Sequence, residues 1–434
     1  MAAFLPLLSH PEHAYVAWWQ DHAIDRAAFL SHVARVAESL PANAYAINLC
    51  EDRYLFIVAF AAALVRGQTN LLPANRSVGE LAALQNAYGD SHALHDHALR
   101  ALIDAVSPPS ASAPPAIATD QIAAIAFTSG STGQPKPNPK TWVSLVAGAQ
   151  LAARRFNFRP GMAVVATVPP QHMYGLETSV LLPLIAGLCV HGGRPFFPDD
   201  LRVALAALPE PRVLITTPAH LRVCAASALD WPPLTFMISA TAPLSAQLAA
   251  QSERVFRAPV LEIYGCTEAG SMASRRTIDG DQWRFYDGLA AYEDNGRYFV
   301  HGGHLANGVA LDDVLEMSAN GRFKLLGRHE DMVNIAGKRA SLANLNHQLN
   351  AIPGVSDGAF IAPDPSVDGV QRLAALVVAP ELSVKQIRAQ LAQRLDPAFL
   401  PRPLYKVDAL PRNATGKLPR QELLALLARL KKPS

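Results

Sequence analysis

The sequence predicts an α/β protein with a large, multi-layer N-terminal domain of αβ sheets and a small, mobile α+β C-terminal domain. Strand-like apolar runs alternate with helical runs through the middle of the chain, which is typical of a sheet with crossover helices. From about residue 284 the pattern changes to short β-like runs, and a smaller αβ unit begins near residue 331. Since 434 residues are too many for one ordinary core, we place the domains at 1–329 and 330–434.

The composition indicates a globular protein and gives no sign of a nucleic-acid partner or a membrane span. Half of the residues are hydrophobic, 17% are charged, and the net charge is only +2. The four cysteines lie far apart without a C-x-x-C pair, so neither zinc nor a disulfide framework is expected. The N-terminus lacks a signal-peptide pattern, and the longest apolar run, 180–190, is too short to insert in a membrane. We therefore expect a cytoplasmic protein.

The first 120 residues predict helices and a short strand. A helix at 54–66 is apolar nearly all round, so it should be buried, and Gly67 should end it. The other elements expected here are a helix at 24–40, a strand at 70–73, a helix at 77–87 and a Pro/Ala/Ser-rich linker or surface loop at 107–119.

A loop rich in glycine and hydroxyl groups follows a buried strand expected at 122–127. Gly130 and Gly133 allow backbone angles that other residues resist, so N–H groups can turn inward. Converging donors beside a cation suit a polyphosphate, although an ordinary polar turn is the alternative. The loop is not a Walker A loop, because a Pro-Lys pair stands where that motif has Gly-Lys. The other donors of the loop are Thr128, Ser129, Ser131, Thr132 and Lys136.

Beyond this loop, strands and helices alternate, and a polar cluster follows several of the strands. Ligands of such sheets bind at the carboxyl ends of strands, which is where these clusters fall. Strands are expected at 163–168, 212–216, 234–239 and 259–263, with helices at 142–156, 176–188, 218–228 and 243–256. In the C-terminal part, helices are expected at 342–351, 383–395 and 419–430 and strands at 358–363 and 373–379. The polar clusters are residues 168–176, 239–244, 264–268 and, near the C-terminus, 410–418.

These motifs, in this order, resemble those of the acyl-adenylate-forming (AMP-binding) superfamily, which includes acyl-CoA synthetases, aryl and acyl-carrier-protein ligases, and free-standing adenylation domains. Residues 128–136 resemble TSGSTGxPK and 264–268 resemble YGxTE. Residues 327–339 resemble GRxDDxxxxxGxR and 411–417 resemble PRxxxGK, and the similarity extends from about 54 to 420. The resemblance implies a two-step reaction. A carboxylate attacks the α-phosphate of Mg·ATP to give an acyl-adenylate and pyrophosphate, and a thiol then displaces AMP.

The resemblance also assigns roles to the nucleotide-binding residues. The loop from Thr128 to Lys136 should bind the β- and γ-phosphates, and Tyr264 should lie against adenine. Asp313 should bind the ribose hydroxyls, with Asp312 as its competitor because spacing alone chose between them. Arg328 should contact ribose or phosphate. Ser239, Ala240 and Thr241 should line the adenine and acyl sites.

The expected catalytic residues are Thr267, Glu268, Lys417 and His172. Thr267 should contact the α-phosphate, Glu268 should hold Mg²⁺, and Lys417 should bridge the acyl carboxylate and the α-phosphate. His172 should gate the acyl pocket, or else be a turn or core histidine. The small domain should swing about the hinge residue Glu330 between the two half-reactions, and Gly337 should then line the path of the thiol.

The expected acyl pocket consists of His172, Tyr174, Gly175, Ala240 and Cys266. Tyr174 could instead be a core residue, and Cys266 is more plausible as a small loop filler than as a nucleophile. Adenylation domains for α-amino acids carry an Asp at the position of Met173, so the acid here should lack an α-amino group.

We expect a hydroxybenzoate-like aryl acid as substrate, with a fatty acid second and an amino acid as an alternative. The acceptor should be CoA or the phosphopantetheine of an acyl-carrier protein. Pro137 replaces a glycine usual in the superfamily, Trp142 replaces a frequent His, and the segment at 239–243 lacks two usual glycines. These departures leave open a binding protein without turnover, and an unrelated ATPase is a further alternative.

Overall fold

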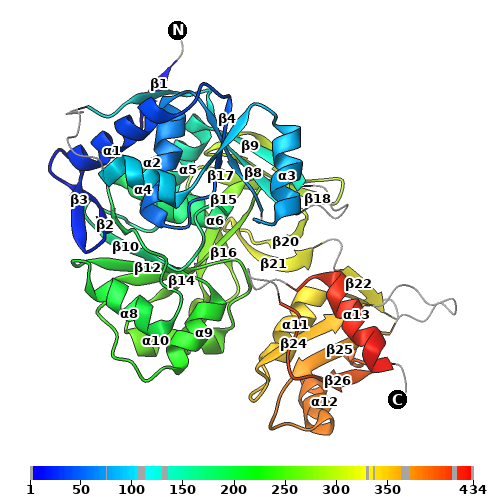
Figure 1. The fold of residues 1–434 in the computed structure, drawn as a ribbon. Coiled ribbons are helices and arrows are strands. Elements are labelled where there is room, and N and C mark those ends of the chain that lie inside the picture. Colours follow the sequence, from blue (N-terminus) through cyan, green and yellow to red (C-terminus); the bar gives the residue numbers. More distant parts are fainter. Residues whose placement is uncertain are drawn as a thin grey trace.

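The computed structural model describes residues 3–74, 76–104, 113–129, 135–328, 332–335, 338–362, 372–412 and 418–431. Within these residues, helices cover mixed sheets, and the smaller C-terminal part lies to one side of the larger N-terminal part (Figure 1). This confirms the predicted α/β class with its smaller C-terminal domain. The exact domain boundary stays a prediction, because residues 329–331, including Glu330, lie outside the described residues. No helix in the described ranges is long and apolar enough to cross a bilayer.

The largest sheet has 11 strands in the order β20-β21-β16-β15-β14-β13-β12-β10-β11-β2-β3. Its middle strands, from β2 through β11, β10, β12 and β13 to β14, run parallel, so their carboxyl ends share one edge. The strands are β2 (Tyr15–Trp19), β3 (His22–Asp25), β10 (Ala163–Ala166), β11 (Cys189–His191), β12 (Arg212–Thr216), β13 (Phe236–Ser239), β14 (Val260–Cys266), β15 (Gly270–Arg276), β16 (Trp283–Phe285), β20 (Asp313–Met317) and β21 (Arg322–Arg328).

Helices connect and cover these strands, as the alternating pattern predicted. They are α5 (Trp142–Arg155), α6 (Met173–Leu176), the π-helical segment η1 (Glu177–Leu181), α7 (Leu182–Ala186), α8 (Pro198–Ala206), α9 (Pro218–Ala226), α10 (Ala246–Phe256) and the 3₁₀ turn η2 (Thr277–Asp279). The helical run starts at Met173 rather than at the predicted residue 176, and α8 was not predicted.

A second sheet has the order β6-β4-β5-β8-β9, and β9 is its edge. β9 contains Pro135, Pro137 and Pro139, alternating with Lys136, Asn138 and Lys140. Because proline lacks an N–H donor, it fits a strand only where its nitrogen side is unpaired, as on an edge. Pro137 is therefore compatible with an edge strand that pairs with β8. The sheet and its helices are β4 (Tyr45–Asn48), β5 (Thr69–Leu72), β6 (Ser91–Leu94), β8 (Ile122–Ser129), β9 (Pro135–Thr141), α1 (Arg26–Ser39), α2 (Arg53–Val65), α3 (Val78–Ala87) and α4 (Asp96–Asp104).

The remaining strands form small sheets, and two of these sheets lie in the C-terminal part. Residues 116–118, predicted as part of a linker or loop, form β7, which pairs with β1. The N-terminal elements are β1 (Phe4–Pro6), β7 (Ala116–Ala118), β17 (Leu289–Asp294), β18 (Arg297–Gly302) and β19 (Leu305–Ala310). The C-terminal elements are β22 (Met332–Ile335), β23 (Lys338–Ser341), α11 (Leu342–Asn350), β24 (Asp357–Ile361), β25 (Ala374–Val378), α12 (Val384–Ala392), η4 (Pro397–Phe399), β26 (Leu404–Lys406) and α13 (Arg420–Lys431).

Candidate active site

The turn between β14 and β15 carries two of the predicted catalytic residues. The two strands are antiparallel neighbours, with Tyr264 opposite Ala273, and the turn residues are Thr267, Glu268 and Ala269. Thr267 and Glu268 are half-buried. The turn begins where β14 ends, at the edge that also holds the carboxyl ends of β12 and β13, which is where a parallel sheet binds ligands.

Three side chains from distant parts of the sequence hold this turn and the start of β15, two of them through turn carbonyls and the third through Ser271. Lys140 Nζ donates to the Glu268 carbonyl at 2.5 Å, and His304 Nε2 lies 2.6 Å from the Ala269 carbonyl. The Glu177 carboxylate accepts from the Ser271 N–H at 3.1 Å and from the Ser271 hydroxyl at 2.5 Å. We call Lys140, Glu177 and His304 the turn clamp. The clamp fixes the backbone that presents Thr267 and Glu268, which is the preorganisation that catalysis requires.

The environment of Lys140 is polar and confined. Burial lowers the pKa of Lys140, whereas the nearby charges of Glu177, the Cys266 thiol and Glu268 act in the opposite direction. In the described part of the chain, Lys140 and Glu177 do not form an ion pair.

Tyr264 and Asp313, the predicted adenine and ribose residues, lie in direct contact. The Tyr264 hydroxyl donates to Asp313 Oδ2 at 2.7 Å, and the tyrosine ring packs between Trp283 and Phe323. Asp312, the competing candidate, is exposed and pairs with Arg297 at 2.9 Å. The geometry therefore favours Asp313 over Asp312 as the residue that faces a nucleotide beside Tyr264.

The end of β13 has an unusual backbone. Thr241 has φ +80°, which is a strained conformation for a β-branched residue and explains why glycine suits this position. Thr241 is exposed, whereas Ser239 and Ala240 are buried. The Ser239 hydroxyl is buried without a hydrogen-bond partner among the described residues. Strain and an unsatisfied hydroxyl at a strand end are features of ligand-binding sites.

The segment that carries His172 and Tyr174 follows β10 and enters α6. His172 is half-buried and its carbonyl accepts from the Leu176 N–H at 2.8 Å. The Tyr174 hydroxyl lies 3.0 Å from the carbonyls of both Thr216 and Ile238, and burial raises its pKa. Since both neighbours can only accept, the single phenolic proton of Tyr174 is committed to the protein backbone. This contact favours the core role of Tyr174 over recognition of a substrate by its hydroxyl.

Gly175 and Arg53 fix this segment in place. A Cβ at Gly175 would collide with the Pro169 carbonyl, so only glycine fits there. The fully buried Arg53 donates through Nη2 to the Ala166 and Val168 carbonyls at 2.8 Å each, and through Nη1 to Ser179. Burial lowers the pKa of Arg53 to about 9. Arg53 therefore ties the N-terminus of α2 to both ends of the segment that bears His172.

Burial disfavours the thiolate form of Cys266. Burial raises the pKa of Cys266 to about 12, and this effect outweighs the Ala269 N–H and the Lys140 ammonium, which act in the opposite direction. The four cysteines are all free thiols. This environment agrees with the prediction of Cys266 as a small loop filler rather than a nucleophile, and its role stays a prediction.

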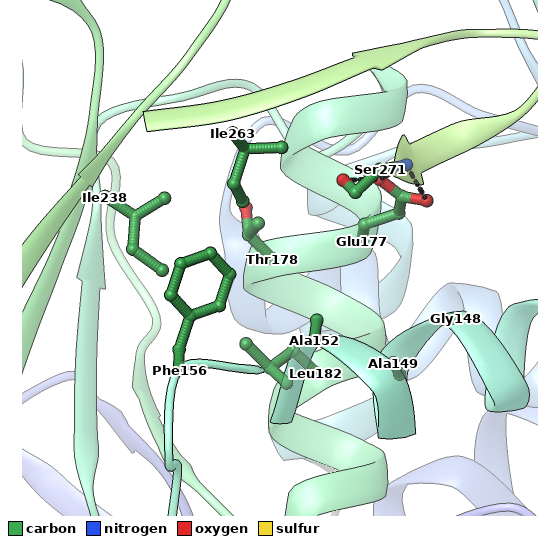
Figure 2. Close-up of a pocket in the computed structure, with 10 residues that line it drawn as sticks. All are labelled: Gly148, Ala149, Ala152, Phe156, Glu177, Thr178, Leu182, Ile238, Ile263 and Ser271. Atoms are coloured by element: carbon green, nitrogen blue, oxygen red, sulfur yellow. Dashed lines mark hydrogen bonds between the residues drawn. The ribbon is translucent and has the colours of Figure 1, made fainter. Parts of the chain in front are cut away.

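A small closed cavity of about 10 Å³ lies beside Glu177 (Figure 2). The hydrogen-bonded pair of Glu177 and Ser271 borders one side, and the apolar side chains of Phe156 and Ile238 face it across the cavity. A cavity of this volume holds about one water molecule. Its other lining residues are Gly148, Ala149, Ala152, Thr178, Leu182 and Ile263.

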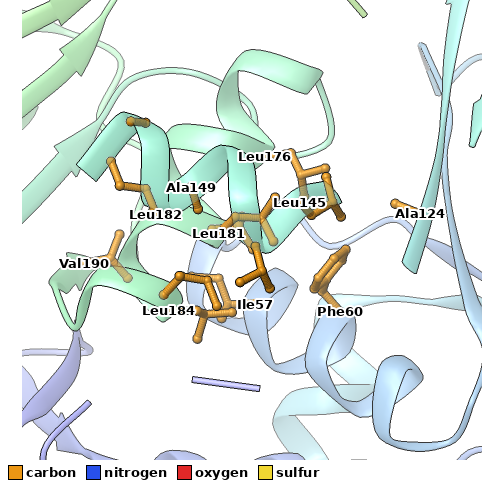
Figure 3. Packing of buried hydrophobic residues seen from close by; sticks show 14 of the residues in the cluster. Ile57, Phe60, Ala124, Leu145, Ala149, Leu176, Leu181, Leu182, Leu184 and Val190 are labelled. Atoms are coloured by element: carbon orange, nitrogen blue, oxygen red, sulfur yellow. The ribbon is translucent and has the colours of Figure 1, made fainter. Parts of the chain in front are cut away.

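The core of the large domain lies directly behind the closed cavity. Ala149 and Leu182, which line the cavity, belong to the same packed cluster as Ile57 and Phe60 of α2 (Figure 3). Ile57 and Phe60 are at most 1% exposed, and burial of each such side chain contributes about 1.5–3 kcal/mol. The apolar helix at 54–66 is thus buried as predicted, and it supports the wall of the site.

A second, open cavity of about 230 Å³ is also lined by Glu177 and lies beside the turn between β14 and β15. The three clamp residues all border it, together with Ala269 and Gly270 of the turn. The other lining residues are Pro139, Thr141, Ser144, Leu145, Met173, Leu305, Ala306, Asn307 and Val309.

Several predicted site residues cannot be placed. Gly130, Ser131, Thr132, Gly133, Gly337 and Lys417, like Glu330, lie outside the described residues. Thr128, Ser129 and Arg328 are described only as backbone of β8 and β21. Lys136 is exposed on β9 and stands opposite Thr128 in the hairpin. The roles of these residues therefore stay predictions.

The predicted magnesium ligand fits the way this ion binds nucleotides. No group of three or more His, Cys, Asp or Glu side chains in the described ranges could hold a metal ion by itself. Mg²⁺ in nucleotide sites needs only one or two carboxylates, since phosphates and waters complete its octahedron. Glu268, on the turn beside Thr267, can supply such a carboxylate.

The chain is similar to known proteins over most of its length. Residues 21–289 match the family described as AMP-binding enzyme. The chain is 30% identical over 304 residues to a 4-coumarate–CoA ligase of Rhodobacter capsulatus, covering 68% of this chain and 74% of that protein. It is 26% identical over 360 residues to a 3-hydroxybenzoate–CoA/4-hydroxybenzoate–CoA ligase of Thauera aromatica, covering 72% and 67%.

Two solved structures share the whole fold. ATP-bound MatB from Rhodopseudomonas palustris has a TM-score of 0.83 at 20% identity, with 97% of each chain covered. MenE, the o-succinylbenzoate CoA synthetase from Bacillus subtilis, with its acyl-adenylate intermediate has a TM-score of 0.82 at 17% identity, covering 100% of this chain and 99% of that one.

Proposed function

The chain belongs to the AMP-binding enzyme family, and from this membership and the site we propose that it is an AMP-forming acid–thiol ligase that activates an aryl acid. In the first half-reaction, a carboxylate oxygen attacks the α-phosphorus of ATP, and the bond to pyrophosphate breaks. In the second, a thiol sulfur attacks the acyl carbon, and AMP leaves. The products are a thioester, AMP and pyrophosphate.

The observation that carries this proposal is the convergence of the nucleotide residues at one sheet edge. Tyr264 contacts Asp313 at 2.7 Å, and Thr267 and Glu268 follow Tyr264 on the turn that the clamp holds. In this arrangement Tyr264 packs against adenine, and Asp313 accepts hydrogen bonds from the ribose hydroxyls. The α-phosphate then comes to lie near Thr267, where the developing charge needs fixed donors.

The remaining charges act on the polyphosphate and the acid. Glu268 would hold Mg²⁺, and the ion would supply positive charge that neutralises the phosphates. Lys136 and the glycine-rich loop bind the leaving pyrophosphate, Arg328 contacts ribose or phosphate, and Lys417 orients the acyl carboxylate toward phosphorus. The small domain then turns about Glu330, which removes Lys417 and admits the thiol.

Three observations support an aryl acid over an amino acid or a fatty acid. Met173 supplies no counter-charge for an α-ammonium, which would be costly to bury unpaired. The open cavity of about 230 Å³ has room for one ring. Relatives of this chain include enzymes named as 4-coumarate and hydroxybenzoate CoA ligases.

The acceptor that these relatives favour is CoA, because their names specify it. The phosphopantetheine of an acyl-carrier protein presents the same thiol arm and is the alternative acceptor. To distinguish the two acceptors, the enzyme and the acid that it prefers are supplied either with CoA or with an acyl-carrier protein. The rate of thioester formation is then compared.

The test is pyrophosphate release from Mg·ATP without any thiol, across a panel of aryl, fatty and amino acids. Release that depends on an aryl acid is expected. Release with amino acids alone would replace the proposed substrate class, and ATP binding without release for any acid would identify a binding protein instead.

A further inference from the structure

Within the turn clamp, Lys140 is the member that contacts the backbone of the predicted magnesium ligand. Its ammonium donates to the carbonyl of Glu268 itself at 2.5 Å. His304 and Glu177 hold residues that follow Glu268 in the chain. A bond to the carbonyl of a residue restricts the rotation of that peptide group, and the rotamers open to a side chain depend on its backbone angles. The bond from Lys140 therefore bears on the direction of the Glu268 carboxylate.

The backbone from which the Lys140 side chain extends is held on both sides. Lys140 is the next-to-last residue of β9 and stands opposite Ala124 of β8. Thr141 then caps α5, because its hydroxyl accepts from the Ser144 N–H at 3.4 Å. Trp142, the first residue of α5, is fully buried. Lys140 therefore reaches the turn from a fixed base, which is what a group that orients another residue requires.

Lys140 also belongs to the hairpin that carries the glycine-rich loop. β8 leads into that loop and β9 leads out of it, with Lys136 four residues before Lys140. Because side chains alternate between the two faces of a strand, Lys136 and Lys140 share one face of β9, about 13 Å apart along it. The loop is expected to bind the β- and γ-phosphates, and the turn is expected to bind the ion that these phosphates share. Lys140 thus links two segments that must hold one Mg·ATP together.

The contact of Lys140 differs from that of an ordinary surface lysine. A surface lysine buries its stem and keeps its charged end in water. Lys140 is half-buried, and its charged end is committed to a backbone carbonyl of the turn. Hydrogen bonds from an ionised donor are roughly twice as strong as neutral ones. The geometry therefore favours a positioning role for Lys140 over a role in solvation.

We propose, resting on the proposed function, that Lys140 is a positioning residue that sets the affinity for Mg·ATP by holding Glu268 in the orientation that binds the ion. Lys140 acts through the turn and not through a contact of its own with the nucleotide. Residues that orient metal ligands contribute about 10–100-fold to metal affinity or activity. Loss of the ammonium should therefore weaken the binding of Mg·ATP and nearly spare the binding of nucleotides without the ion.

The test replaces Lys140 by methionine, which keeps a long apolar stem but has no donor. Calorimetry on the full chain, without an acid, measures the dissociation constants of Mg·ATP, of ATP in EDTA and of AMP in EDTA. We expect Lys140→Met to weaken Mg·ATP by at least about tenfold and each metal-free nucleotide by at most about twofold. Retained AMP binding also shows that the variant is folded. If Lys140→Met does not fold, Lys140→Gln, which keeps a polar end, takes its place in the same comparison.

Lys406→Met is the matched control. Lys406 likewise donates to a backbone carbonyl, that of Pro380 at 3.1 Å, but it is exposed and lies on β26 in the C-terminal part. The control removes one lysine charge and one bond of the same kind away from the turn. It should leave all three dissociation constants within about twofold. An equal loss of Mg·ATP affinity in the two variants would overturn the inference, because it would reflect only the lost charge.

Three other results would also overturn the inference. Equal Mg·ATP affinity in the wild type and in Lys140→Met would show that the turn does not depend on this bond. An equal loss for all three nucleotides would assign Lys140 a structural role only. An equal loss for ATP with and without magnesium, with AMP unaffected, would indicate that Lys140 contacts the phosphates directly. In each of these cases a wild type that binds Mg·ATP leaves the proposed function standing, whereas a wild type that binds no Mg·ATP contradicts both.

Discussion

Replacement of Asp313 by alanine should weaken ATP binding, whereas the same change at its neighbour Asp312 should not. Asp313 is half-buried and accepts a hydrogen bond from Tyr264 at 2.7 Å. The Asp312 side chain is 66% exposed and pairs with Arg297, whose side chain is 52% exposed. The two carboxylates are adjacent in sequence and equal in charge. A difference between the two variants therefore reports the place of the carboxylate and not the loss of one negative charge.

The expected size of the effect follows from the bonds that each carboxylate can make. A hydrogen bond to a charged group contributes about 1.5–3 kcal/mol, and a ribose offers two hydroxyls to Asp313. Loss of two such bonds costs at least about 3 kcal/mol, which is roughly a 100-fold rise in the dissociation constant of ATP. The Asp312–Arg297 pair is exposed, so its loss should cost at most about 1 kcal/mol of stability and leave ATP affinity within twofold.

Isothermal titration of Mg·ATP into each variant, without an acid, measures this difference directly. Thermal unfolding of both variants checks that they are folded. Equal affinities for the two variants, or a loss confined to Asp312→Ala, would refute the assignment of Asp313 to the ribose.

Three further predictions concern the strained strand end, a buried histidine and the unplaced lysine. Thr241→Gly should relieve about 1–2 kcal/mol of backbone strain at φ +80° and lose about 0.5–1 kcal/mol through the unfolded chain, so urea unfolding should show a net gain near 0.5–1 kcal/mol. A net loss would mean that the threonine side chain makes important contacts. Burial lowers the pKa of His10, so the folded protein binds fewer protons there than the unfolded chain, and stability should fall as the pH drops below about 6.5. The melting temperature should therefore decrease from pH 7.5 to 5.5, less steeply in His10→Gln, and an identical slope in that variant would exclude His10 as a cause. Lys417→Ala should abolish adenylate formation but leave thioester formation from a supplied acyl-adenylate largely intact, and equal loss of both half-reactions in single-turnover assays would contradict its assigned role.

The sequence predicted most of the described α-helices because their signals are local, but it missed many of the strands, among them β2, β11 and β15. The run at 54–66 is apolar all round, and Gly67, with φ +72°, ends the helix there as expected. The other parallel strands of the largest sheet were recognisable as short apolar runs between amphipathic helices. β9 was not predicted, because three prolines within seven residues normally argue against a strand. Only its place at the edge of a sheet permits them, and edge position is a tertiary property.

The site was predicted only in part, because some of its residues lie within one short motif whereas others meet only in the folded chain. Tyr264, Thr267 and Glu268 lie within one short motif, and Asp313 was proposed by spacing, to which the structure adds the contact with Tyr264. The turn clamp could not be predicted, because Lys140, Glu177 and His304 belong to three separate elements that meet only in the folded chain. A glutamate in a mostly apolar helical run was the one signal of the clamp in the sequence.

The most direct test of the proposed ligase reaction follows an oxygen atom from the acid to the nucleotide. The enzyme is incubated with Mg·ATP, CoA and an aryl acid whose carboxylate carries ¹⁸O, and the nucleotide product is analysed by mass spectrometry. Attack of the carboxylate on the α-phosphorus predicts AMP that contains one ¹⁸O atom, together with pyrophosphate and an acyl thioester. Formation of ADP and phosphate, or of AMP without the label, would contradict the account.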